Sequence, residues 1–267
     1  MRSRYHLDDL LTLMARLRDP LDGCPWDCQQ TAQSLIPHTL EEVYEVVDAI
    51  EQADWAHLAE ELGDLLFQIV FYCQLAREAG HFDLTTVVDQ LTQKLIRRHP
   101  HVFPDGTLAS RRANNAPELA ELANRWEQIK ATEQKVPSST LGSVPLAMPA
   151  MARAHKLQKK AARVGFDWPE TAPVWGKLDE ELTELKAAVA QDDTESILEE
   201  MGDVLFSIIN LARHLKVDPE QALRHTNAKF VARFSAIEAQ LGEKQPADVD
   251  LMTLESLWQA AKDKKKV

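Results

Sequence analysis

The chain has 267 residues, and its 30 Lys and Arg against 42 Asp and Glu give a formal net charge of −12 at pH 7. This balance disfavours a general surface for a nucleic acid polymer or an anionic membrane, although a bound metal would still let a small phosphorylated ligand approach. No apolar run reaches the roughly 18 to 20 residues that a membrane span needs. Asp8 and Asp9 stand where a secretory signal would have its apolar core, so we expect a cytoplasmic protein.

Apolar residues recur at helical spacing and strand-like alternation is nearly absent, which predicts an all-α fold. The expected helices cover 6–18, 38–52, 55–79, 84–98 and 116–134, and then 149–162, 173–190, 194–215, 218–241 and 253–264. The stretches 99–115 and 136–147 predict loops, because Pro and polar residues replace the helical pattern there. Because the second loop separates two similar halves, we expect domains at 1–135 and 149–267, joined by a linker at 136–148.

One acidic pattern occurs twice, and adding 139 to each position of the first copy gives the second. The first copy comprises Glu41, Glu42, Glu45, Glu60, Glu61 and Asp64, and the second comprises Glu180, Glu181, Glu184, Glu199, Glu200 and Asp203. Carboxylates three residues apart share one face of a helix, and two such pairs on adjacent helices form a set of oxygen ligands for a hard cation. A single pair is typical of a solvated helix face, but the repetition in register favours a metal site.

Carboxylate oxygens without His or Cys suit Mg²⁺, Mn²⁺ or Ca²⁺ rather than zinc or copper, and we expect Mg²⁺, with Mn²⁺ as a substitute. Mg²⁺ usually takes few carboxylates and completes its coordination with water and phosphate oxygens, which points to phosphate chemistry. Glu180 and Glu199 each stand just before a pair of carboxylates spaced three apart in the second copy. Each could be a catalytic base, an outer residue around the metal or an exposed residue. Gly63 and Gly202 lie inside acidic helices, where glycine costs about 1 kcal/mol, so we expect close helix packing there.

Basic and aromatic residues supply candidate substrate contacts. Lys229 and Arg233 lie one helical turn apart and would hold phosphate oxygens, and Lys94 and Arg98 repeat this spacing in the first half. Lys177 precedes Glu181 by one turn, where a solvated lysine is an equally good interpretation. Trp258 offers a stacking surface for a base, although core packing is favoured for a single tryptophan.

Several motifs together resemble the MazG family of nucleoside triphosphate pyrophosphohydrolases. They are LRDPLDGCPWD at 17–27, RRHPHVF at 97–103, RWEQIK at 125–130, VGFDW at 164–168, EEMGDVLF at 199–206 and the duplicated acidic pattern. The resemblance implies an all-α fold of the dimeric dUTPase-like, or MazG-like, superfamily, and Mg²⁺-dependent hydrolysis of nucleoside triphosphates to monophosphate and pyrophosphate.

The resemblance also implies roles for individual residues. Metal ligands fall on Glu181, Glu184, Glu200 and Asp203, and nucleotide contacts fall on Lys177 through Glu181, on Lys229, on Arg233 and on Trp258. It further implies that the C-terminal half is the main catalytic unit, although the N-terminal ligand set of Glu42, Glu45, Glu61 and Asp64 is intact.

Two other interpretations remain beside this one. A di-iron carboxylate bundle usually contains Glu-x-x-His, and the corresponding positions here are Glu45, Asp64, Glu184 and Asp203, which weighs against it. The alternative outside enzymology is a metal-stabilised helical dimer that senses nucleotides or binds proteins. We expect a homodimer in either case, because the apolar stripe at 205–211 is broad enough to need burial on more than one side. Few polar residues suited to reading a base accompany the metal ligands, so we expect broad tolerance for NTPs and dNTPs.

Overall fold

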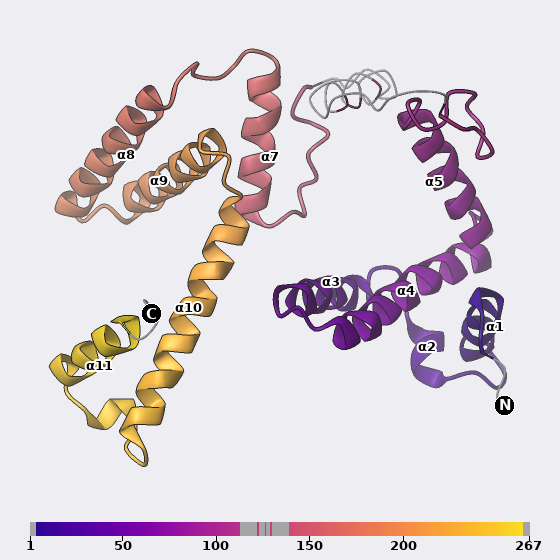
Figure 1. The fold of residues 1–267 in the computed structure, drawn as a ribbon, viewed down its shortest axis with the longest axis horizontal. Coiled ribbons are helices and arrows are strands. Elements are labelled where there is room, and N and C mark those ends of the chain that lie inside the picture. Colours follow the sequence, from indigo (N-terminus) through magenta and orange to yellow (C-terminus); the bar gives the residue numbers. More distant parts are fainter. Residues whose placement is uncertain (1–3, 113–121, 123–125, 127–128, 130–138, 264–267) are drawn as a thin grey trace. The chain divides into compact units, whose positions relative to one another are not determined.

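The computed structural model describes residues 4–112, 122, 126, 129 and 139–263, and every regular element within them is a helix (Figure 1). The predicted all-α fold is therefore confirmed. The chain forms two compact units, residues 1–134 and residues 135–267. None of the described helices combines the length and apolar character that crossing a membrane requires.

The N-terminal unit is organised around a hairpin of two long helices, α3 (Ile36–Glu51) and α4 (Trp55–Glu78). Helix α1 (Leu7–Leu17) and helix α5 (Leu84–Arg98) pack against α4, and the short α2 (Pro25–Gln29) lies in the connection from α1 to α3. The α3–α4 turn is closed by Asp54, whose side chain accepts hydrogen bonds from the backbone N–H groups of Ala56 and His57, both at 3.1 Å. This cap satisfies N–H groups that the first helical turn leaves unpaired.

The C-terminal unit repeats the hairpin with α8 (Thr171–Gln191) and α9 (Thr194–His214), and α7 (Ala150–Arg163) packs on α9. Asp193 caps α9 as Asp54 caps α4, at the same offset of 139. Helix α10 (Pro219–Leu241) leads away from the hairpin, and after the short 3₁₀ helix η1 (Pro246–Asp248) the chain returns as α11 (Leu251–Asp263) along α10 (Figure 1).

Each unit has its own small apolar core. In the N-terminal unit it consists of Met14, Leu35, Val70, Phe71, Cys73 and Leu84, and in the C-terminal unit of Val174, Leu178, Val204 and Leu211. The N-terminal core lies where α1 and α5 meet α4, with Leu35 from the start of α3. The C-terminal core lies between α8 and α9, so it fixes how these two acidic helices face each other.

The structure differs from the predicted elements in a few places. Helices α2 and η1 were not predicted, because five and three residues are too few to show helical periodicity. The predicted helix at 116–134 lies mostly outside the described residues, although residues 122, 126 and 129 are helical. The expected close packing at Gly63 and Gly202 was wrong: a Cβ atom at either position would meet nothing within 4 Å.

Candidate active site

The C-terminal hairpin brings three of the four predicted metal ligands together. Carboxylate oxygens of Glu181, Glu184 and Glu200 lie within 4.8 Å of one another, the first two from α8 and the third from α9. Glu181 is 5% exposed, so its carboxylate faces the interior of the hairpin. Asp203, one turn after Glu200, lies close enough to act on the Glu200 carboxyl electrostatically but is outside the 4.8 Å group.

These carboxylates repel one another. Burial raises the pKa of Glu184, and the charge of Glu200 raises it further. Burial also raises the pKa of Glu200, with Glu181 and Asp203 adding to the effect and the Lys177 ammonium partly offsetting it. Such a group of like charges is typical of a site that a cation neutralises, and oxygen donors alone suit Mg²⁺ or Mn²⁺.

Lys177 lies beside this cluster. Its Nζ is 2.8 Å from a carboxylate oxygen of Glu180 and 2.8 Å from one of Glu181, and these two partners raise its pKa. Glu180 and Glu199, the candidate bases, are both exposed residues next to the cluster. An exposed carboxylate at the edge of a metal site is accessible to water, as a base requires.

The N-terminal hairpin holds a matching cluster of Glu42, Glu45 and Glu61, also within 4.8 Å. Burial raises the pKa of Glu42, and Asp64 is the nearby carboxylate that raises it most. Here His57 pairs with Glu61, with 2.6 Å between Nε2 and Oε1. The position that corresponds to Lys177 is His38 (177 minus 139), so this copy lacks the lysine.

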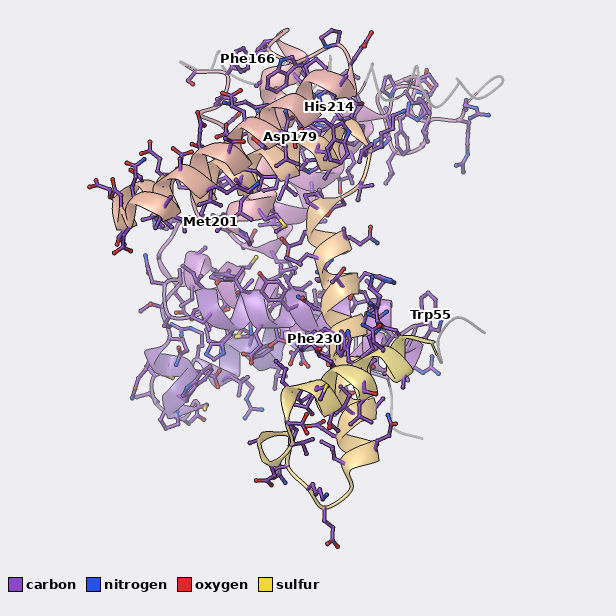
Figure 2. All side chains as sticks on the ribbon, turned by 90° about the vertical axis from the view of Figure 1, so that its left-hand side faces the viewer. Trp55, Phe166, Asp179, Met201, His214 and Phe230 are labelled. Atoms are coloured by element: carbon purple, nitrogen blue, oxygen red, sulfur yellow. The ribbon has the colours of Figure 1, made fainter. Side chains whose placement is uncertain are left out.

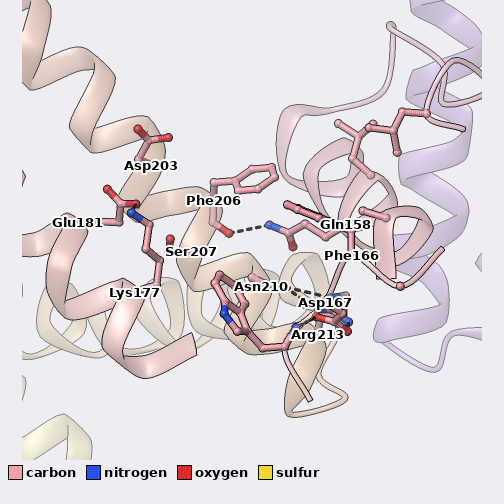
Figure 3. A pocket seen from close by; sticks show the side chains of 15 residues that line it. Gln158, Phe166, Asp167, Lys177, Glu181, Asp203, Phe206, Ser207, Asn210 and Arg213 are labelled. Carbon is pink, nitrogen blue, oxygen red and sulfur yellow. Dashed lines mark hydrogen bonds and ion pairs between the residues drawn. The ribbon is translucent and has the colours of Figure 1, made fainter. Parts of the chain in front are cut away.

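A cavity of about 670 Å³ opens from the C-terminal cluster along the hairpin (Figure 3). Glu181, Asp203 and Lys177 line one side of it. Aromatic side chains and the side-chain amides of Gln158 and Asn210 line the other side. The remaining lining residues are Leu141, Leu157, Gln158, Ala161, Gly165, Phe166, Asp167, Trp168, Phe206, Ser207, Asn210 and Arg213. The cavity therefore joins a cation site to an apolar chamber large enough for a small organic molecule.

The loop between α7 and α8 closes the far end of this cavity. Asp167 accepts hydrogen bonds from both terminal nitrogens of Arg213 and contacts the His214 Nε2 at 3.0 Å. The Arg213 guanidinium is the main reason that the pKa of Asp167 is lowered. Gly165 has a φ of +89°, a conformation that other residues adopt with strain. The residue after this sharp turn is Phe166, which is 83% exposed (Figure 2).

The sequence did not identify Gln158, Phe166, Asn210 or Arg213 as site residues. The VGFDW motif contributed only to the family resemblance, and in the structure Asp167 also accepts a hydrogen bond from the Trp168 N–H. No local pattern indicates that Gln158 and Asn210, 52 residues apart in number (210 minus 158), line one cavity.

Other predicted substrate residues lie elsewhere. Lys229 and Arg233 are on α10 and Trp258 is on α11, and none of them lines the cavity. The Arg233 guanidinium carbon lies 5.5 Å from the Trp258 ring centre. In the first half Arg98 lies 5.7 Å from the Trp126 ring centre, and Lys94 precedes it on α5. Within one chain, therefore, Lys229, Arg233 and Trp258 do not line the cavity beside the carboxylate cluster.

Comparison with known proteins agrees with this geometry. The family model described as the MazG nucleotide pyrophosphohydrolase domain matches residues 30–103 and 174–236, which contain both acidic hairpins. The chain is 47% identical over 262 residues to the nucleoside triphosphate pyrophosphohydrolase of Escherichia coli (strain K12), covering 96% of this chain and 97% of that protein.

More distant relatives extend the similarity. The nucleoside triphosphate pyrophosphohydrolase/pyrophosphatase MazG of Thermotoga maritima is 43% identical over 259 residues, covering 96% of this chain and 95% of its own length. The uncharacterized protein YabN of Bacillus subtilis is 42% identical over 264 residues, covering 97% of this chain and 52% of that protein. Two matched domains and nearly full-length similarity show that the chain belongs to the MazG nucleotide pyrophosphohydrolase family.

Proposed function

We propose that the protein hydrolyses nucleoside triphosphates to nucleoside monophosphate and pyrophosphate at its C-terminal hairpin, with Mg²⁺ or Mn²⁺. The observation that carries the proposal is the cavity, which has the Glu181 cluster and Lys177 on one side and the aromatic loop residues on the other. A nucleoside triphosphate has the same polarity, with a charged phosphate chain at one end and an aromatic base at the other. The names of the two most similar relatives described above support the same reaction.

The residues divide the chemistry among them. Glu181, Glu184 and Glu200 would hold the metal with Asp203, and the bound cation neutralises phosphate charge and lowers the pKa of a water molecule. Lys177 would contact phosphate oxygens after leaving its carboxylate partners. Glu180 or Glu199 would accept the proton of the attacking water. The water oxygen bonds to the α or the β phosphorus atom as the bond from that atom to the bridging oxygen breaks, and nucleoside monophosphate and pyrophosphate leave.

The N-terminal copy differs at the positions that form the cavity. In the register of the repeat, Asn210 corresponds to Phe71 (210 minus 139), which is fully buried in the apolar core. The position of Lys177 is taken by His38, and a histidine, His57, pairs with Glu61 in the N-terminal cluster. The N-terminal unit therefore keeps a carboxylate cluster, but Phe71 packs in its core at the position where Asn210 lines the C-terminal cavity. This contrast supports the C-terminal unit as the main catalytic one.

A second copy of the chain would complete the site. On α9 the side chains of Met201, Leu205 and Ile208 share one face and are between 44% and 50% exposed. Leu62, Leu66 and Ile69 repeat this face on α4. Gly202 adjoins it, and the open space over this glycine leaves room for another backbone. We propose a homodimer in which these faces are covered and Lys229 and Arg233 of the partner reach the phosphate end, with Trp258 beside Arg233.

Broad tolerance for NTPs and dNTPs is part of the proposal, since the metal ligands and Lys177 would act on the phosphate chain, which all of these nucleotides share. The alternative function, a metal-stabilised module that senses nucleotides or binds proteins, would use the carboxylates alone. A chamber of about 670 Å³ next to the cluster favours the enzyme, because a structural metal site does not need one.

The test is product analysis. Purified protein is incubated with a panel of NTPs and dNTPs and Mg²⁺, and the products are separated by ion exchange. We expect monophosphate and pyrophosphate in equal amounts. Nucleoside diphosphate with orthophosphate would overturn the cleavage position, and binding of nucleotide without any product would favour the sensing module.

A further inference from the structure

Gln158 on α7 carries an unpaired polar atom at the cavity wall. The residue is 7% exposed, and its Nε2 donates a 2.8 Å hydrogen bond to the backbone oxygen of Phe206. Its Oε1 is buried without a hydrogen-bond partner. Because Nε2 must face a carbonyl oxygen, the amide cannot be turned around, and Oε1 is fixed as an acceptor. A buried acceptor that no protein group satisfies needs a donor from outside the protein, which a water molecule or a ligand can supply.

Asn210 on α9 presents the opposite group. Its Oδ1 accepts from Nε of Arg213 at 3.1 Å and from Nη2 of the same residue at 2.8 Å. A guanidinium only donates, so Oδ1 must face it, and the amide nitrogen is the end that remains for a ligand. Arg213 is itself held by Asp167, which keeps this orientation rigid.

Both amides line the cavity with the aromatic residues Phe166 and Trp168. Figure 3 shows Gln158, Phe166 and Arg213 on the side away from Glu181, Lys177 and Asp203. A phosphate chain held at the metal cluster would therefore place the base among two aromatic rings, one fixed acceptor and one fixed donor.

We propose that Gln158 and Asn210 read the nucleobase: Gln158 Oε1 accepts an N–H of the base, and Asn210 Nδ2 donates to a carbonyl oxygen or ring nitrogen. This inference rests on the proposed function, whose substrate it specifies. Each of the common bases has an N–H donor and an acceptor, so the pair tolerates all of them. It rejects a base whose N–H groups are blocked, such as an N-methylated one. Since Oε1 is itself buried, contact with a base requires the wall around it to open slightly.

The experiment is a cycle that changes protein and ligand in turn. UTP is compared with N3-methyl-UTP, which lacks the ring N–H, in wild type and in Gln158→Leu. In the wild type we expect methylation to lower kcat/KM by about tenfold or more, the usual effect of leaving a buried polar group unpaired. In Gln158→Leu the acceptor is absent, so kcat/KM for UTP and kcat/KM for N3-methyl-UTP should agree within about twofold. Asn210→Leu should lower kcat/KM for UTP by about tenfold through the lost donor.

Gln240→Leu is the matched control, because Gln240 also donates through Nε2 to a backbone carbonyl, that of Ala236, outside the cavity. It should keep the wild-type methylation ratio. Circular dichroism and thermal unfolding check that each variant folds. Asn210→Leu gives a second reading should Gln158→Leu unfold.

Two results would overturn the inference. One is a wild type that uses both nucleotides equally. The other is a methylation effect that persists undiminished in Gln158→Leu, because a steric clash rather than a hydrogen bond would then be responsible. The same cycle is also measured as binding of the α,β-methylene analogues, which needs no turnover. A protein that fails to hydrolyse UTP but discriminates between these analogues would refute the proposed function and leave base reading supported.

Discussion

Replacing Glu181 by Gln, with Glu42→Gln as its matched partner in the other unit, tests the assignment of the catalytic half. Both residues occupy the same position of the repeat, and each belongs to a cluster of three carboxylates within 4.8 Å. Glutamine keeps the shape and one oxygen ligand but removes the charge. The two variants therefore make the same chemical change in two different surroundings.

The magnitude follows from the charge that is lost. At an effective dielectric constant of about 20, a carboxylate roughly 4 Å from a divalent cation contributes about 8 kcal/mol of attraction before desolvation. Desolvation and the remaining amide oxygen offset part of this, and we take about 4 kcal/mol, which corresponds to about a thousandfold in kcat/KM. For Glu42→Gln we expect a change below about twofold, because its cluster shares no residue with the cluster of Glu181.

The assay measures pyrophosphate release from one nucleotide at fixed Mg²⁺ for both variants and the wild type. Thermal unfolding in EDTA is the control for folding. Without metal the relief of repulsion between carboxylates opposes the loss of the Lys177–Glu181 pair, so Glu181→Gln should unfold at a temperature close to that of the wild type. Equal losses in the two variants, or a larger loss in Glu42→Gln with folding preserved, would refute the assignment.

Three further predictions address the loop, the metal and the assembly. Asp167→Asn should lower stability by about 1 to 2 kcal/mol at pH 7 through the weakened pairs with Arg213 and His214. The pKa of Asp167 is lowered in the folded protein, so the difference in unfolding free energy between wild type and variant is present above the ordinary aspartate pKa of about 3.9. It is lost as the pH falls through the folded value. Chemical denaturation at several pH values measures it. Excess EDTA should abolish pyrophosphate release and Mg²⁺ or Mn²⁺ should restore it, whereas zinc should restore little, and activity that survives EDTA would contradict an oxygen-ligated metal. Light scattering should give twice the chain mass of 30.1 kDa for the wild type and a lower mass for Leu205→Asp, with Leu91→Asp on α5 as an exposed apolar control; a monomeric wild type would refute the dimer.

The sequence by itself determined the helices and the register of the acidic residues. Helical periodicity and the spacing of three between carboxylates are local properties, so α3, α4, α8 and α9 could be placed within a few residues of their observed ends. The duplication with a constant offset indicated two hairpins. Because the hairpins are closed by short turns capped at Asp54 and Asp193, the pairing of the acidic helices followed from the sequence too.

Only the tertiary structure decided what lines the cavity beside the C-terminal cluster. The contact of Gln158 with Phe206 spans 48 residues and that of Arg213 with Asp167 spans 46, and no local pattern encodes such pairs. The same holds for the contrast between Phe71 and Asn210. At one position of the repeat the side chain fills a core in the first unit and faces a cavity in the second. Whether an aligned position is filled or hollow depends on how neighbouring helices pack, and packing is set by side chains distant in sequence.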